Sequence, residues 1–146
     1  MKSTAPEIGL VFETPQTYAR RPGEPPDAHA EYEPESTIEV LEAANHPVGI
    51  VTKSAMVTRD IDILSRMADK GLARVALSVT TLDRKLARTM EPRAATPPKR
   101  LQAIRELSDA GIPVSVMAAP MIPGLNDHEL ERILDSAKAA GATSAG

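Results

Sequence analysis

Residues Arg74–Arg93 read RVALSVTTLDRKLARTMEPR, and this stretch decides the fold. It begins with apolar residues at 75–77 and 79, a run typical of a strand that is buried on both faces of a sheet. Small hydroxyl residues follow, and the spacing predicts a helix over residues 82–90 that leads to Arg93. In α/β proteins, ligands bind at the carboxyl ends of the strands. We therefore expect a small polar or zwitterionic ligand at the end of this strand.

The composition fits one small globular domain with an aliphatic core. The chain has 146 residues, of which 42% are hydrophobic, but it contains one Phe, two Tyr and no Trp. Its net charge of −3 offers no overall attraction to nucleic acid or to an anionic membrane. No apolar run approaches the roughly 20 residues that cross a bilayer. The N-terminus lacks the apolar centre of a secretory signal, so we expect a cytoplasmic protein without membrane contact.

The chemistry-bearing residues are sparse. The chain has no cysteine, which excludes disulfides, Cys-ligated zinc and Cys-ligated iron–sulfur clusters within it. The three histidines have no metal-like spacing, and no pair of carboxylates stands at two strand ends. No glycine-rich phosphate-binding loop is present. The sequence therefore indicates neither a catalytic residue nor a metal ligand.

The chain divides into two parts. Residues 1–34 are rich in proline and charge, and we expect an irregular segment in which only Ile8–Phe12 could form a strand. Residues 35–146 alternate predicted strands with predicted helices, which indicates a parallel sheet with right-handed crossovers. The predicted strands are Val48–Thr52, Ala73–Val79 and Pro113–Ala119, and the predicted helices begin near Ser36, Asp60, Thr96 and Asn126.

The fold class is therefore α/β, with about three parallel strands and flanking helices. Both an open doubly wound sheet and part of a (β/α) barrel fit this pattern. Three strands cannot close a barrel, and the residues after Gly141 resemble the entry to a further strand, so we expect a fragment of a larger fold. Near the last helix, Asn126 and Glu129 have capping-box spacing, which predicts that both act locally at the helix start.

Candidate binding residues stand at the predicted strand ends. Lys53 follows the first strand and is either a carboxylate or phosphate ligand or an ordinary solvated lysine. Ser78 and Thr80 alternate along the second strand, where they either bind ligand hydroxyls or bond nearby backbone. Arg93 either binds the ligand or ties down its loop. The Ile122–Gly124 turn either approaches a flat ring or is plain turn chemistry.

Several blocks of the chain resemble a known family. They include HPVGIVTKS, VALSVTTLD, LARTMEPRAATPPKRLQAI and AGIPVSVMAAPMIPGLNDHELERIL, and they extend over 36–146. The most specific are the run 91–97 and the APMIPGLND block. Together they resemble radical S-adenosylmethionine enzymes of the group labelled DNA repair photolyase or spore photoproduct lyase-like. This resemblance implies a partial (β/α) barrel in which three cysteines hold a [4Fe–4S] cluster that reduces S-adenosylmethionine.

The resemblance also implies positions for the bound S-adenosylmethionine, although no cluster ligand carries over to this cysteine-free chain. Lys53 and Arg93 would hold the methionyl carboxylate, and Ser78 and Thr80 would bind the ribose. The backbone of Ile122 and Gly124 would lie beside the adenine.

The resemblance predicts a fragment of a radical S-adenosylmethionine enzyme that is inactive alone, from a parent whose substrate is unidentified and for which DNA is a candidate. The alternatives are a module that binds S-adenosylmethionine without catalysis, a fragment that docks on a partner or on itself through open sheet edges, and an inert gene remnant.

Overall fold

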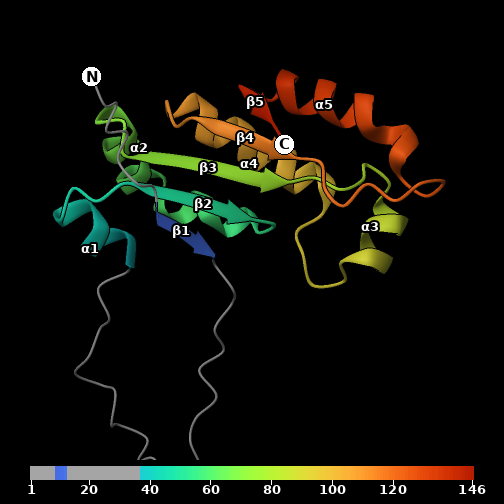
Figure 1. The fold of residues 1–146 in the computed structure, drawn as a ribbon, viewed down its shortest axis with the longest axis horizontal. Coiled ribbons are helices and arrows are strands. Elements are labelled where there is room, and N and C mark those ends of the chain that lie inside the picture. The colour runs from blue at the N-terminus through green and yellow to red at the C-terminus, as the bar shows by residue number, and fades with distance from the viewer. Residues whose placement is uncertain (1–8, 13–36) are drawn as a thin grey trace, which may run out of the picture.

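A computed structural model describes residues 9–12 and 37–146 (Figure 1). These residues form a five-stranded sheet with the strand order β1-β2-β3-β4-β5, in which every neighbouring pair is parallel. Parallel neighbours in sequence order require a crossover after each strand. The strands are β1 Gly9–Phe12, β2 Val48–Thr52, β3 Ala73–Ser78, β4 Val114–Met117 and β5 Ser144–Ala145.

Helices make the crossovers. Figure 1 shows α2 and α4 passing behind the strands, and α3 lying beyond the carboxyl end of β3. None of the described helices is long and apolar enough to cross a bilayer. The α-helices are α1 Thr37–Ala43, α2 Ile61–Asp69, α3 Arg84–Met90, α4 Pro97–Asp109 and α5 Leu130–Ala139, with short 3-10 helices η1 Ala55–Asp60 and η2 Asp127–Glu129.

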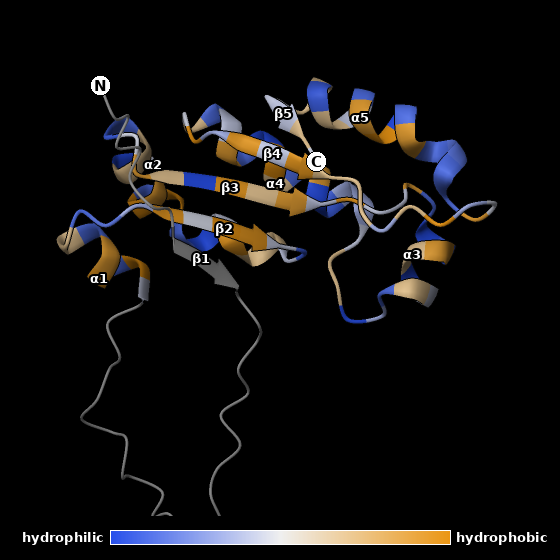
Figure 2. Ribbon diagram, viewed as in Figure 1, coloured by the Kyte–Doolittle hydropathy of each residue, from blue (hydrophilic) through white to orange (hydrophobic). Residues whose placement is uncertain are grey.

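The core lies between the sheet and the helices. Alternate residues of the three central strands are buried, and the register aligns Ile50 with Val75 and Val75 with Val114. Figure 2 shows the hydrophobic colouring that follows these strands. The helices contribute buried aliphatic residues from one face each: Leu64 and Met67 from α2, Ile104 and Leu107 from α4, and Ile133 and Ala137 from α5.

The opposite face of the sheet is less covered, so the prediction that the second strand is buried on both faces is wrong. In β3, Arg74 is exposed and Ala76 is half-buried, and Ser115 of β4 is half-buried beside them. These residues line a shallow cavity of about 260 Å³. A doubly wound sheet carries helices on both faces, whereas a (β/α) barrel carries them outside only. The one-sided cover therefore favours part of a barrel.

The predicted α/β class and the three central strands are confirmed. Two short edge strands extend the expected number: β1 lies within the predicted Ile8–Phe12, and β5 follows Gly141 where a further strand was expected. The remainder of the predicted irregular segment 1–34 lies outside the described residues. The helix predicted over 82–90 begins at Arg84, because the Asp83 side chain accepts the first free backbone N–H groups, from residues 85 and 86, at 2.6 and 3.1 Å.

Candidate functional site at the carboxyl edge of the sheet

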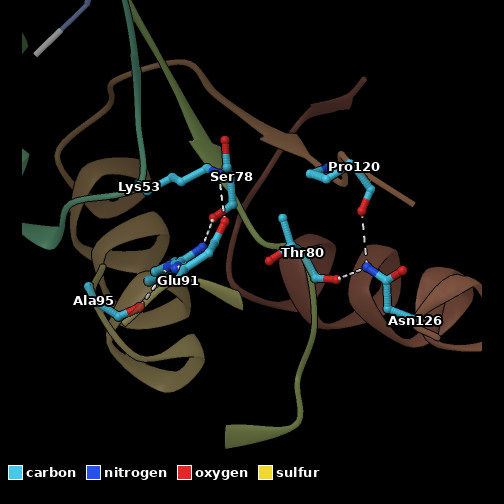
Figure 3. Close-up of polar contacts among 8 residues, drawn as sticks. Lys53, Ser78, Thr80, Glu91, Ala95, Pro120 and Asn126 are labelled. Carbon is cyan, nitrogen blue, oxygen red and sulfur yellow. Dashed lines mark hydrogen bonds and ion pairs between the residues drawn. The ribbon is translucent and has the colours of Figure 1, made fainter. Parts of the chain in front are cut away.

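Lys53 follows β2 at the carboxyl edge and is held by a carboxylate. Its Nζ lies 2.5 Å from Oε1 of Glu91, the residue that ends α3, and its side chain stays 45% exposed (Figure 3). The Glu91 side chain is 10% exposed. The lysine is therefore neither buried nor an unattached loop residue: it is a partly accessible cation placed at the strand edge by an internal partner.

Arg100 completes this cluster from the buried face of α4. Its Nη2 contacts the second carboxylate oxygen of Glu91, its Nη1 donates to the Ser78 carbonyl oxygen at 2.8 Å, and its Nε donates to the Ala95 carbonyl oxygen at 2.7 Å. The side chain is 2% exposed. Three fixed donors on one planar group thus join the end of β3, the segment after α3 and the start of α4.

The sequence analysis named Arg93 as the candidate arginine and missed Arg100. The side chain of Arg93 is exposed and has no partner among the described residues, so whether it reaches a ligand stays a prediction. A signal for the other arginine was present: Arg100 shares the spacing of the buried residues Ala103, Ile104 and Leu107. A charge on the buried face of a helix requires a partner, and the nearby Glu91 is that partner.

The surroundings of Glu91 stabilise the ionised form of its carboxyl group. Burial alone would raise the pKa of this carboxyl group, but the hydrogen bonds from Lys53 and Arg100 outweigh it and hold the pKa below its ordinary value. The cluster therefore carries one negative and two positive charges.

Thr80, just beyond β3, has a buried hydroxyl group without a partner. The residue is 1% exposed, and no hydrogen bond to its Oγ1 exists among the described residues. Its backbone is fixed, because its carbonyl oxygen accepts from Asn126 Nδ2 at 2.7 Å. Ser78 is also fixed through its carbonyl oxygen, and Figure 3 shows its hydroxyl group on the opposite side from that oxygen. Within 9–12 and 37–146, neither hydroxyl group bonds backbone, which was the alternative to ligand binding.

Asn126 has a long-range role, so the predicted capping box is wrong. The side chain is fully buried; its Nδ2 donates to the carbonyl oxygens of Thr80 at 2.7 Å and Pro120 at 3.0 Å, and its Oδ1 accepts from the N–H of Ile122 at 2.7 Å (Figure 3). It makes no side-chain cap. Asn126 therefore joins the end of β3 to the loop after β4.

Glu129 makes a second tie between the same two segments. Its Oε1 accepts from the Thr81 hydroxyl group at 2.9 Å, and its Oε2 accepts from the Leu82 N–H at 2.6 Å. It is buried and makes no side-chain cap at the start of α5, which begins at Leu130. Together the two ties fix the connection after β3 where the candidate hydroxyl groups lie.

The backbone N–H groups of the Ile122–Gly124 turn are already used by hydrogen bonds within the chain. The N–H of Ile122 donates to Asn126, and the N–H of Gly124 donates to Asp127 Oδ1 at 3.0 Å. Gly124 has φ of +75°, a left-handed conformation that favours glycine. The Ile122 side chain is exposed, so it can offer apolar contact.

Nothing in the described part of the chain fits a metal ion or an iron–sulfur cluster. Among those residues, no group of three or more His, Cys, Asp and Glu could hold a metal. The whole sequence lacks cysteine, the usual ligand of a [4Fe–4S] cluster. The polar groups at this edge are a partly exposed lysine and the hydroxyl groups of two buried residues, Ser78 and Thr80. These groups suit an organic ligand with a carboxylate and hydroxyl groups.

Comparison with known proteins assigns the family. Residues 13–137 match the model of the radical SAM superfamily, where SAM denotes S-adenosylmethionine. A parallel sheet with helices on one side and a polar carboxyl edge agrees with the partial barrel expected of such proteins. The chain belongs to the radical SAM superfamily. The family implies binding of S-adenosylmethionine and of a [4Fe–4S] cluster. This chain has no cysteine to ligate such a cluster.

The similar curated proteins are uncharacterized. One from Mycobacterium tuberculosis is 35% identical over 108 residues, which cover 73% of this chain and 32% of that protein. One from Acidianus two-tailed virus is 40% identical over 74 residues, covering 51% of this chain and 24% of that protein. One from Methanocaldococcus jannaschii is 30% identical over 82 residues, which cover 56% of this chain and 30% of that protein. The chain thus matches about a third or less of the length of these relatives.

Proposed function

We propose that the carboxyl edge of β2 and β3 binds S-adenosylmethionine. The observation that carries the proposal is the Thr80 hydroxyl group, which is buried and has no partner among the described residues. Leaving such a group unpaired costs about 1–3 kcal/mol, a cost that a ligand hydroxyl group beside it removes. The ribose of S-adenosylmethionine supplies hydroxyl groups of this kind, and Ser78 lies on the same strand end.

Lys53 holds the methionyl carboxylate in this proposal. It must turn from Glu91 to the ligand, and Glu91 stays paired because Arg100 remains bound to it. Arg93 is the second candidate cation for the same carboxylate. Ile122 and Gly124 lie beside the adenine; because their N–H groups are bonded within the loop, they contribute surface contact and not hydrogen bonds.

The proposed role is ligand binding without catalysis by this chain alone. In the superfamily, an iron–sulfur cluster supplies the electron that cleaves S-adenosylmethionine, and thiolates hold that cluster. Since this chain has no cysteine, we propose that it is one part of a larger radical SAM site and that another segment or polypeptide supplies the thiolates. We expect no cleavage of S-adenosylmethionine by the chain by itself.

The narrower assignment rests on the motif blocks. The run 91–97 and the APMIPGLND block at 119–127 support the DNA repair photolyase or spore photoproduct lyase-like group. That assignment extends the proposal to DNA as a substrate of the whole protein. A cysteine motif of the cluster-binding type in coding sequence adjacent to this one would support the proposal that the chain is one part of a larger radical SAM enzyme.

Docking on a partner or on a second copy is the other candidate function. The described sheet ends at β1 and β5, whose outer edges have no described neighbour, and open edges promote association. Large hydrophobic side chains are also exposed around the loop after β4: Ile122, Leu125 and Leu130. Sedimentation equilibrium tests docking on a second copy: a dimer or larger species favours it, and a monomer at all concentrations opposes it.

Mapping by NMR tests the binding proposal. In a titration of the ¹⁵N-labelled chain with S-adenosylmethionine, the backbone resonances of Lys53, Ser78 and Thr80 should shift in a saturable way. Resonances at the opposite edge, such as those of Val48 and Ala73, should not shift. Saturable shifts confined to another part of the chain, or none up to several millimolar ligand, would overturn the proposal.

A further inference from the structure

A second pocket lies between α3 and the start of α4, next to the candidate site. Its volume is about 310 Å³, large enough for a phosphate group with its neighbouring atoms. Figure 1 places α3 beyond the carboxyl end of β3, and the pocket is lined by residues of this helix and of the segment that leads to α4. Its lining residues are Arg84, Ala87, Arg88, Glu91, Pro92, Ala94, Ala95 and Thr96.

The pocket is electropositive. Arg84 and Arg88 lie one turn apart on the same side of α3, and both line the cavity. Both are exposed, and no carboxylate pairs with either one among the described residues. Glu91 is the acidic member of the lining, but its two carboxylate oxygens already contact Lys53 and Arg100. Two guanidinium groups therefore remain uncompensated at one cavity.

Thr96 adds a hydroxyl group from the other side of the pocket. It stands at the N-cap position of α4 but makes no side-chain cap hydrogen bond. Prolines at 97 and 98 remove two backbone donors of the first turn, including one that a capping side chain normally accepts. The helix end therefore offers few N–H groups, and recognition of a ligand depends on the side chains.

We propose that this pocket binds a phosphoryl group, with Arg84 and Arg88 bonding its oxygens and Thr96 donating its hydroxyl group. Arginine presents paired donors that match phosphate geometry, and two of them around one cavity suit a group with three or more oxygens. S-adenosylmethionine carries no phosphate, so this site goes beyond the proposed binding of S-adenosylmethionine and does not depend on it. The phosphoryl group belongs either to a small phosphate ester or to a nucleic-acid backbone.

Two probes and two double variants test this proposal at one fixed, low ionic strength, because phosphate binding weakens with salt. Inorganic phosphate is titrated by NMR, and a short fluorescein-labelled DNA duplex is titrated by anisotropy. The test variant is Arg84→Gln with Arg88→Gln. The control is Arg105→Gln with Arg132→Gln, which removes the same charge from exposed positions on α4 and α5.

The test variant should weaken binding of the recognised probe by about tenfold or more, and the control by less than about twofold. Arginine-dependent binding of phosphate alone identifies a small phosphate ester as the ligand class. Arginine-dependent binding of the duplex at much lower concentration than phosphate identifies a nucleic-acid backbone. Equal loss in both variants, or no saturable binding of either probe, overturns the proposal.

Discussion

Lys53 Nζ lies 2.5 Å from Glu91 Oε1, and this contact joins the carboxyl end of β2 to the end of α3. The cation proposed to bind the methionyl carboxylate is thus held by an internal carboxylate. A ligand carboxylate must compete with Glu91 for Lys53, whereas Arg100 keeps Glu91 paired throughout.

Glu91→Gln should therefore strengthen binding of S-adenosylmethionine. The Lys53 side chain is 45% exposed, and exposed ion pairs contribute about 0–1 kcal/mol, so we expect a two- to fivefold lower dissociation constant at most. Asp135→Asn, which removes one exposed negative charge from α5, is the control. Titrations are run at a temperature at which circular dichroism shows every variant folded. Equal or weaker binding in Glu91→Gln would contradict the competition.

The same carboxylate should make stability depend on pH. Burial raises the pKa of Glu91, but hydrogen bonds from Lys53 and Arg100 outweigh it, so the folded pKa lies below the ordinary value of 4.5. The resulting stabilisation is fully present above pH 4.5 and is lost as the pH falls through the lower folded pKa. In urea unfolding, the free energy of unfolding of Glu91→Gln should therefore fall less than that of wild type as the pH falls through this range.

At neutral pH the same variant should lose on the order of 3 kcal/mol of stability, because Arg100 stays buried without its carboxylate. Identical pH profiles for wild type and Glu91→Gln would show that the pair contributes nothing.

Two adjacent threonines should respond in opposite directions to replacement by valine. Thr80→Val removes a buried hydroxyl group that has no described partner, and should raise the free energy of unfolding by about 1 kcal/mol. Thr81→Val removes a hydroxyl group that bonds Glu129 and the Asp83 N–H, and should lower it by about 1–3 kcal/mol. Urea unfolding of both variants measures the two changes. A destabilised Thr80→Val would mean that its hydroxyl group is satisfied in the free protein.

Gly141 should tolerate alanine less well than other left-handed glycines. It has φ of +105°, and a Cβ there would collide with Oγ and Cβ of Ser108. Gly71, with φ of +70°, has open space around the same position. Gly71→Ala should lower the free energy of unfolding by about 1–2 kcal/mol, from backbone strain alone. Gly141→Ala should destabilise the protein more than Gly71→Ala does, as measured by thermal unfolding. Equal destabilisation by the two substitutions would mean that the Ser108 side chain moves away freely.

Local patterns in the sequence predicted the elements well. Apolar runs bounded by glycine, proline or polar residues mark β2, β3 and β4, and helical spacing marks α2, α4 and α5. These signals lie within single elements, so they do not depend on which elements meet. The short edge strands were predicted only as possibilities, because four and two residues carry little pattern.

Long-range partners could not be predicted from spacing. Asn126 and Glu129 have the spacing of a capping box, but the fold brings the end of β3 beside them, and their side chains bond that segment instead. The structural role of Arg100 was missed for a related reason. Proximity to a strand end in sequence suggested Arg93, whereas the burial of Arg100 on α4 and its contact with Glu91 depend on tertiary packing.

The most direct measurement is the affinity for S-adenosylmethionine by ligand-observed NMR, for wild type, Lys53→Ala and the exposed control Lys99→Ala. Without chelation by a cluster, wild type should bind at about millimolar concentration, near −4 kcal/mol. A charge-assisted contact contributes roughly 1.5–3 kcal/mol, so Lys53→Ala should weaken binding about tenfold or more, while Lys99→Ala matches wild type. Binding that neither substitution changes, or that both change equally, would contradict a site at the carboxyl edge of β2 and β3.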